Sequence, residues 1–125
     1  MFDHVSIGVK DLGRSKTFYD AVLGPLGYGC LSEDASALGY GAGKVSFWVL
    51  ASEAPVAADD ASGLHFCLAA PTRQGVDAFH AAALEQGGID NGKPGVRADY
   101  DPNYYAAFVK DPDGYRIEAY CAASA

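Results

Sequence analysis

The stretch HVSIGVKDLGRSKTFYDAVL, residues 4–23, aligns without a gap to HFCLAAPTRQGVDAFHAAAL, residues 65–84. Each stretch begins with apolar residues at alternate positions, which is typical of a strand that is buried on one face. Each continues with apolar residues at helical spacing, after a helix N-cap candidate, Asp11 or Thr72. The alignment therefore predicts that one strand-helix unit occurs twice in the chain.

After each predicted helix the sequence is typical of strands and turns. We expect strands in the first half near 28–33, 36–41 and 44–50, and in the second half near 95–99, 104–110 and 115–121. The glycine-rich stretches 39–44 and 87–95 are predicted to be turns, because neither has the phosphate-loop pattern. The predicted fold class is α+β, with two β-α-β-β-β modules that form a cupped, mostly antiparallel sheet and carry helices on its outer face.

The length of the chain fits a single domain over residues 1–125. We place the first module at 1–50 and the second at 63–121. Residues 51–62 are rich in Ala, Pro, Asp and Ser, have no amphipathic period, and are predicted to link the modules.

Composition limits the class of partner. The formal net charge of −7 argues against nucleic acid or an anionic membrane, since both require a basic patch. The 3 cysteines have no CxxC spacing, so neither a disulfide framework nor a thiolate zinc site is indicated. No apolar run approaches the roughly 20 residues of a membrane span, and we expect a cytoplasmic protein whose partner is a small-molecule substrate.

Two histidines occupy the same position of the repeat. His4 and His65 each lie on the face of the first strand opposite its apolar residues, so we expect them to converge on the concave side of the sheet. Glu118, in DPDGYRIEAY, is a third candidate, because a carboxylate is costly to bury in a strand unless it is paired or bound to metal. Two imidazoles and one carboxylate form a facial triad that suits Fe, Mn, Ni or Zn as a divalent ion. The alternatives are two ordinary strand histidines and a solvent-facing charge.

Three stretches carry a resemblance to a known family: FDHVSIGVKDLGRSKTFYDAVLGPLGY at 2–28, GLHFCLAA at 63–70 and YYAAFVKDPDGYRIEAY at 104–120. The chain resembles members of the vicinal oxygen chelate superfamily, which includes glyoxalases, bleomycin-resistance proteins and extradiol dioxygenases. The resemblance implies paired modules around a metal that chelates adjacent oxygens of a substrate.

In this superfamily the ligands come from the first and last strand of each module, which implies His4, His65 and Glu118 here. Matching Gly43 to Gly114 places the fourth position at Phe47, and a slip of one residue would place it at Trp48. Neither side chain binds metal, so the four-ligand chemistry of glyoxalases is not expected. The reaction stays open between oxygenation on Fe(II) and a lyase, isomerase or thiol-transfer reaction on a redox-inert metal.

The remaining site residues follow from the expected cup. If the terminal hairpin pairs Lys110 with Tyr115, Tyr105 and Tyr120 share a face, and Tyr105 supplies a catalytic hydroxyl beside Glu118; the alternative is a stabilising aromatic pair. Other expected pocket residues are Ser6, Phe47, Trp48, Cys67 and Tyr120. Arg97, Arg116 and Lys110 are either carboxylate-binding residues or surface charges.

A function of another class is also compatible with these residues. A metal-free cup lined by aromatic side chains would sequester a ligand, as in the bleomycin-resistance type. By analogy with proteins of this type and size, we expect a homodimer, in which exchanged modules would place His4 of one chain beside Glu118 of the other.

Overall fold

The computed structural model describes residues 1–57 and 59–124. The first module comprises β1 (Val5–Val9), α1 (Leu12–Leu23), the 3-10 helix η1 (Gly24–Leu26), β2 (Gly29–Glu33), β3 (Ala37–Gly41) and β4 (Val45–Ala51). After the 3-10 helix η2 (Asp60–Ser62), the second module comprises β5 (Phe66–Ala69), α2 (Arg73–Glu85), β6 (Ile89–Val96), β7 (Tyr105–Lys110) and β8 (Arg116–Cys121). The predicted α+β class with two β-α-β-β-β modules is confirmed.

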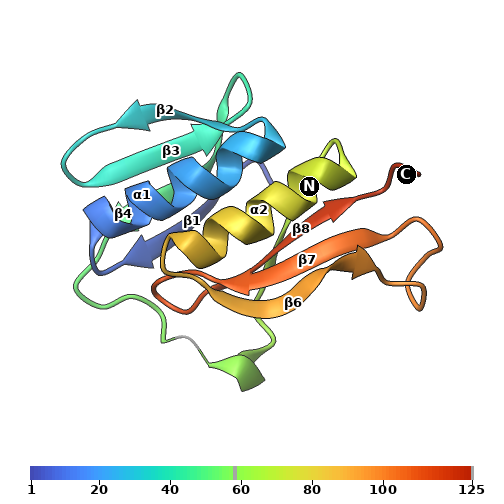
Figure 1. Cartoon of the computed structure of the whole chain (residues 1–125). Coiled ribbons are helices and arrows are strands. Elements are labelled where there is room, and N and C mark those ends of the chain that lie inside the picture. Colours follow the sequence, from blue (N-terminus) through green and yellow to red (C-terminus); the bar gives the residue numbers. More distant parts are fainter. Residues whose placement is uncertain (58, 125) are drawn as a thin grey trace.

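Each module forms its own sheet, and the two sheets have the same topology. Their strand orders are β1-β4-β3-β2 and β5-β8-β7-β6, so in each module the first strand lies beside the last. These two strands are parallel, whereas the other neighbours are antiparallel. Figure 1 shows α1 and α2 side by side, with the sheet of the first module next to α1 and the sheet of the second module next to α2. The sequence repeat is therefore a structural repeat.

Both helices begin at the predicted caps. The side chain of Asp11 accepts a hydrogen bond from the backbone N–H of Arg14, and that of Thr72 accepts one from Gly75. These bonds satisfy N–H groups that have no partner within the helix. The chain leaves η1 through Gly27, whose φ of 88° favours glycine, and turns into β2. Neither helix of the described residues has the length and apolarity that a membrane crossing requires.

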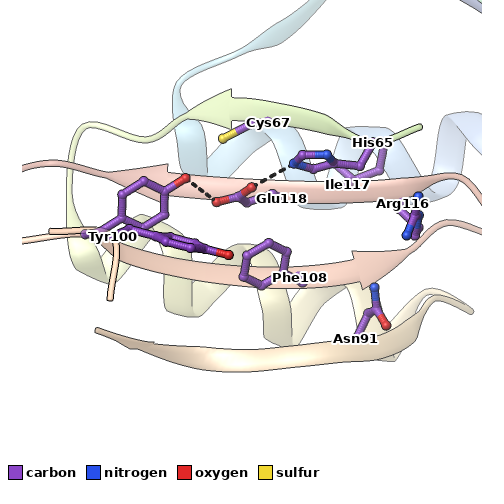
Figure 2. Close-up of a pocket in the computed structure, with 9 residues that line it drawn as sticks. His65, Cys67, Asn91, Tyr100, Phe108, Arg116, Ile117 and Glu118 are labelled. Atoms are coloured by element: carbon purple, nitrogen blue, oxygen red, sulfur yellow. Dashed lines mark hydrogen bonds and ion pairs between the residues drawn. The ribbon is translucent and has the colours of Figure 1, made fainter. Parts of the chain in front are cut away.

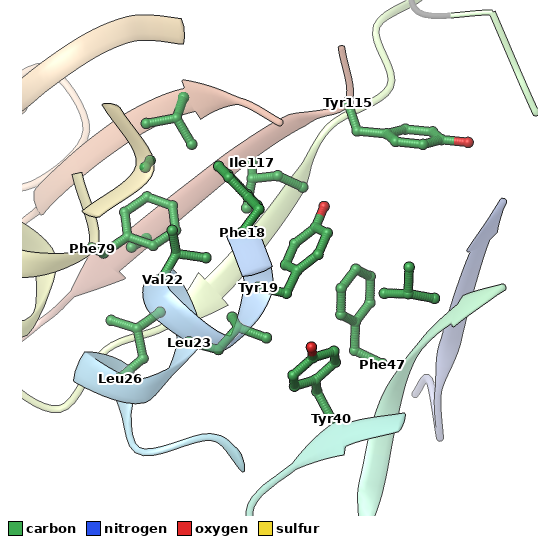
Figure 3. Close-up of a cluster of buried hydrophobic side chains, with 14 of the residues drawn as sticks. Phe18, Tyr19, Val22, Leu23, Leu26, Tyr40, Phe47, Phe79, Tyr115 and Ile117 are labelled. Atoms are coloured by element: carbon green, nitrogen blue, oxygen red, sulfur yellow. The ribbon is translucent and has the colours of Figure 1, made fainter. Parts of the chain in front are cut away.

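A single hydrophobic core joins the modules. Figure 3 shows Phe18 of α1 among side chains of the second module, including Phe79 and Ile117, while Tyr19 points toward Phe47. The rings of Tyr19 and Phe47 are 5.3 Å apart with an interplanar angle of 67°. Burying each such side chain stabilises the fold by about 1.5–3 kcal/mol, so the packing of α1 also fixes the second module.

A hydrogen bond reinforces this junction. The Tyr19 hydroxyl donates to Asp111, 2.5 Å away, in the turn between β7 and β8. Asp111 is only 2% exposed, and it also accepts from the backbone N–H groups of Asp113 and Tyr115. Helix α1 of the first module thus holds the turn that leads into the last strand of the second.

The second strand of the second module was wrongly placed near 95–99. The structure has β6 at Ile89–Val96, within the glycine-rich stretch that was predicted to be a turn. Its pairing with β7 is irregular around Gly92 and Gly95, and it lies at the edge of its sheet. An edge strand tolerates Gly and Pro because it pairs on one side only, which explains why the local sequence signal is weak.

The predicted linker at 51–62 includes the last residue of β4 and all of η2, and position 58 in it lies outside the described residues. Position 125, the last of the expected domain, also lies outside them.

The register of the terminal hairpin differs by one residue from the expected one. Lys110 pairs with Arg116, not with Tyr115, and Glu118 therefore lies opposite Phe108. The extra residue is accommodated at Gly114, whose φ of 91° is typical of a turn that ends in a glycine bulge. Because side chains alternate along a strand, this shift exchanges the two faces of β7 relative to β8.

Candidate functional site

The open face of the second sheet carries a hollow of about 540 Å³. Strand pairing brings the residues together, because Cys67 on β5 and Phe108 on β7 are the neighbours of Glu118 on β8. The hollow is lined by His65, Cys67, Asn91, Tyr100, Tyr104, Phe108, Arg116, Ile117 and Glu118. Figure 2 shows Glu118 and His65 directed toward each other, with Phe108 below them.

Glu118 is the buried acid of this site. The residue is 3% exposed, and its two carboxylate oxygens have different partners. Oε1 lies 3.0 Å from Nε2 of His65, and Oε2 accepts a hydrogen bond of 2.7 Å from the Tyr104 hydroxyl. These partners offset the cost of desolvating a carboxylate. They also fix its orientation toward the hollow.

Two weak acids beside Glu118 stay protonated at neutral pH. Burial, followed by the neighbouring Glu118, raises the pKa of the Tyr104 hydroxyl above its usual value. The same two causes raise the pKa of the Cys67 thiol to about 12. Tyr104 is therefore a hydrogen-bond donor to Glu118, and Cys67 lacks the thiolate that a nucleophile needs.

Stacked aromatic rings form one end of the site. The rings of Tyr104 and Tyr120 stack at 3.9 Å with an interplanar angle of 21°. Tyr100 meets Tyr104 edge to face, with 5.0 Å between ring centroids. Tyr120 was an expected pocket residue. It does not line the hollow itself, but it stacks on Tyr104, which does, and the three tyrosines form an aromatic wall. This wall limits how far the Tyr104 hydroxyl can move.

Tyr105, the expected source of a hydroxyl, lies elsewhere. The register shift turns it to the other face of the sheet, opposite Cys121. Its hydroxyl donates to Asp77 on α2, 2.6 Å away, and the Arg73 guanidinium lies over its ring. The hydroxyl next to Glu118 belongs to Tyr104, which the sequence reasoning missed. The glycine of DPDG was the available signal, since a glycine bulge there shifts the register by one residue.

Phe47 was also expected in the pocket; it does not line this hollow, but it lines a smaller one of about 220 Å³ that Cys67 also borders. The side chain is 9% exposed and packs in the core between Tyr19 and Phe66. Trp48, the next residue, lies on the open face of the first sheet, where it pairs with Ser6. Ser6 and Trp48 therefore share a face with each other, but they belong to a different sheet from Glu118.

Strand register identifies the counterpart of Glu118 in the first module. Ser6 and Cys67 are equivalent in the repeat; Ser6 pairs with Trp48, and Cys67 pairs with Glu118. The pairing of β3 with β4 shifts between Tyr40 and Gly41, which adds one residue to β4. Trp48 thus occupies the position of the acid, and the match of Gly43 to Gly114 fails by this bulge.

The donors present fit part of a metal site. His65 and Glu118 offer one imidazole nitrogen and one carboxylate oxygen at the edge of the hollow, which are ligands that Fe, Mn, Ni and Zn accept. His4 lies before β1 in the other sheet, where its Nδ1 is 2.9 Å from Asp3 and its side chain is 52% exposed. Within residues 1–57 and 59–124, no three His, Cys, Asp or Glu side chains are grouped to hold an ion. One described chain therefore brings two of the three expected ligands together.

Comparison with known proteins now places the fold. The family model of the glyoxalase/bleomycin resistance protein/dioxygenase superfamily matches residues 1–119. The chain belongs to this superfamily. A glyoxalase/bleomycin resistance protein from Albidiferax ferrireducens is 36% identical, with a TM-score of 0.85, and the alignment covers 97% of this chain and 98% of that one.

More distant members of the superfamily share the fold alone. The fosfomycin resistance protein FosX from Listeria monocytogenes is 12% identical, with a TM-score of 0.70 over 97% of this chain and 92% of that one. A family enzyme from Burkholderia phytofirmans is 20% identical, with the same TM-score over 97% and 98% of the two chains. No curated protein sequence matches closely enough to count as a relative.

Proposed function

We propose that this member of the superfamily is a divalent-metal-dependent enzyme acting on a small-molecule substrate. Its metal would be held by His65 and Glu118 of one chain and by His4 of a second copy. The observation that carries the proposal is Glu118, a buried carboxylate whose oxygens are directed by His65 and Tyr104 at the wall of an open hollow. A carboxylate with no role would gain more from solvent than from this position.

When bound, a divalent ion would act as a Lewis acid toward oxygen atoms of the substrate. The chain's own residues hold the Glu118 carboxylate in a fixed orientation. Tyr104 holds Oε2 of Glu118, which leaves Oε1 directed toward His65. Phe108, the neighbour of Glu118 on β7, supplies an apolar surface of the hollow beside the carboxylate. Hydrogen bonds of this kind, outside the ligands themselves, set ligand orientation in metal sites.

The homodimer is part of the proposal, because the third ligand needs it. His4 lies outside the sheet that carries Glu118, and both sheets present an open face. Two copies related by a twofold axis would apply the first sheet of each to the second sheet of the other, which forms two identical sites. A cytoplasmic location is proposed as well, and the free thiols of the chain's cysteines support it.

Elemental analysis of protein purified without chelators tests the metal. We expect about one ion per chain in the wild type and in Glu85→Gln, a control that removes an exposed carboxylate on α2. Glu118→Gln and His4→Ala should both purify without metal. Iron would favour oxygenation, whereas zinc, nickel or manganese would favour lyase, isomerase or thiol-transfer chemistry. A folded wild type that stays metal-free after reconstitution would contradict the proposal.

Mixing variants tests whether two chains share the site. Glu118→Gln still carries His4, and His4→Ala still carries His65 and Glu118. Unfolding and refolding an equal mixture makes half of the dimers mixed, each with one complete site, so metal should return to about a quarter of the chains. A site built within one chain would give no recovery on mixing.

A metal-free sequestering protein is the second candidate. The stacked tyrosines Tyr100, Tyr104 and Tyr120 favour it, because they offer a planar aromatic surface that needs no metal. Binding of planar compounds by a wild type that takes up no ion would support this function over the enzyme.

A further inference from the structure

Two arginines, Arg116 in the lining of the hollow and Arg97 over the Phe108 ring, form no ion pair with a carboxylate among the described residues. Nε of Arg116 donates to the backbone oxygen of Leu64 at 3.1 Å, and Arg97 donates to the backbone oxygens of Gly95 and Lys93. Within the described residues neither guanidinium is in an ion pair, although the chain has 16 acidic and only 9 basic residues. The charge of Arg116 reaches Asp60, where it helps to lower the pKa of that carboxyl, but the contact with Leu64 uses only Nε. A guanidinium presents further N–H donors in a planar fork that matches a carboxylate, so Arg116 can bind another anion.

One guanidinium lines the hollow, and the other lies over a ring that lines it. Arg116 lines the hollow, and the Arg97 guanidinium lies over the Phe108 ring, 5.3 Å from its centroid. Asn91 lies at the same end of the hollow as Arg116, and Tyr100 lies at the opposite end (Figure 2). The hollow thus has a cationic end, a flat apolar floor and an aromatic end.

The spacing along β8 sets a length. Arg116 and Glu118 are two residues apart and point to the same face, so their Cα atoms are about 7 Å apart. That is about the length of a six-membered ring with one substituent at each end. A molecule whose anionic group reaches Arg116 would therefore place its far substituent at Glu118 and its ring over Phe108.

We propose that the hollow of the second module binds a small planar ring compound that carries a carboxylate. The carboxylate meets Arg116 and Asn91, the ring lies on Phe108, and the substituent opposite the carboxylate faces Glu118 and His65. That this compound is the substrate rests on the proposed function; that it binds does not. Tyr100, which is 68% exposed, forms the outer edge of the region that the ligand's ring would occupy.

The overall charge of the protein makes the inference specific. At a net charge of −7, the surface as a whole repels anions. A neutral ring compound should therefore bind better than its acid anywhere except at a local cationic site. A preference for the acid is evidence for such a site.

The test compares 4-hydroxybenzoate with 4-hydroxybenzamide, which has the same shape without the charge. Both are titrated into the full-length protein after its metal has been removed with a chelator, and binding is followed by ¹H–¹⁵N NMR. We expect the acid to bind about tenfold or more tightly than the amide. The amide N–H signals of Asn91, Phe108 and Arg116 should shift most. Equal affinities, tighter binding of the amide or no binding of either probe would overturn the proposal.

Variants assign the preference to its residue. Arg116→Gln should bring the two affinities together, and Arg116→Lys should keep much of the preference for the acid. Arg73→Gln is the matched control, because Arg73, like Arg116, donates its Nε to a backbone oxygen, but it lies on the helix-covered side of the sheet. It should behave as the wild type. A preference for the acid that survives Arg116→Gln would refute the assignment.

Because the titration is done without metal, it tests the binding site independently of the proposed enzyme. Preference for the acid without any metal uptake would leave this binding site standing and remove the enzyme. Metal uptake with no preference for the acid would do the reverse.

Discussion

Replacing Tyr19 with phenylalanine removes one hydroxyl from the junction of the modules. That hydroxyl donates to Asp111 at 2.5 Å, and both residues are buried. Phenylalanine keeps the ring and its contacts with Phe18 and Phe47. The substitution therefore isolates a single hydrogen bond between α1 and the turn before β8.

The expected loss of stability is about 2 kcal/mol, since hydrogen bonds to charged groups contribute about 1.5–3 kcal/mol. We take a value below the middle of that range, because Asp111 keeps the backbone N–H donors of Asp113 and Tyr115. For a domain of 125 residues this loss corresponds to a decrease in Tm of about 6–10 °C.

The loss should depend on pH in a defined direction. Burial raises the pKa of Asp111 above its usual 3.8, while the Tyr19 hydroxyl lowers it by stabilising the ionised form. Tyr19→Phe therefore raises this pKa further. The difference in free energy of unfolding is complete where Asp111 is ionised in both proteins. It shrinks as the pH falls through the two folded-state pKa values, to the roughly 1 kcal/mol of a neutral hydrogen bond.

Urea unfolding followed by circular dichroism, at pH 7.5 and at successively lower pH, measures both effects. Tyr40→Phe is the matched control, because the Tyr40 hydroxyl donates to Asp20, whose side chain is 44% exposed. Its loss should be smaller and should not follow the titration of Asp111. Equal losses in the two variants, or a loss for Tyr19→Phe that is independent of pH, would refute the reasoning.

Two further predictions concern other parts of the fold. A Cβ at Gly39 would lie 2.8 Å from the Trp48 ring. Gly39→Ala should therefore lower the free energy of unfolding by about 1–3 kcal/mol and change the fluorescence of the single tryptophan. Gly29→Ala is the control, because its Cβ would meet nothing within 4 Å, and it should have neither effect. The hydrogen bond from His80 is the main cause that lowers the pKa of Asp90 to about 2. The stabilisation that Asp90→Asn removes should therefore be complete above the unfolded value of 3.8 and be lost as the pH falls through 2. A difference that does not decrease between pH 4 and pH 2 in acid titrations would contradict this.

The sequence contained the repeat, the helix caps and the faces of the first strands. Val5 and Ile7 alternate with Ser6 because one side of β1 meets the core, and such alternation is readable from local pattern. Asp11 and Thr72 were readable for a similar reason, since a cap acts on N–H groups within one turn. These features depend on contacts over a few residues.

The features that were predicted wrongly depend on single inserted residues. One bulge after Gly41 moved Phe47 into the core and Trp48 to the open face, and the bulge at Gly114 exchanged Tyr105 for Tyr104. Nothing in an alternating pattern fixes where a bulge falls, and one residue reverses every face that follows. The expected convergence of His4 with His65 stays a prediction, because it depends on how two copies of the chain would meet.

The tryptophan at the position equivalent to Glu118 has an electrostatic consequence. An ion held by His65, Glu118 and a second copy's His4 would meet two neutral rings and a single carboxylate, so one positive charge of a divalent cation would stay uncompensated by the protein. A second acid at Trp48 would have cancelled it. Electroneutrality would then come from whatever molecule enters, which favours ligands that arrive as monoanions or lose a proton on the ion. A one-residue bulge in β4 would thus determine the charge of the ligand that the site binds.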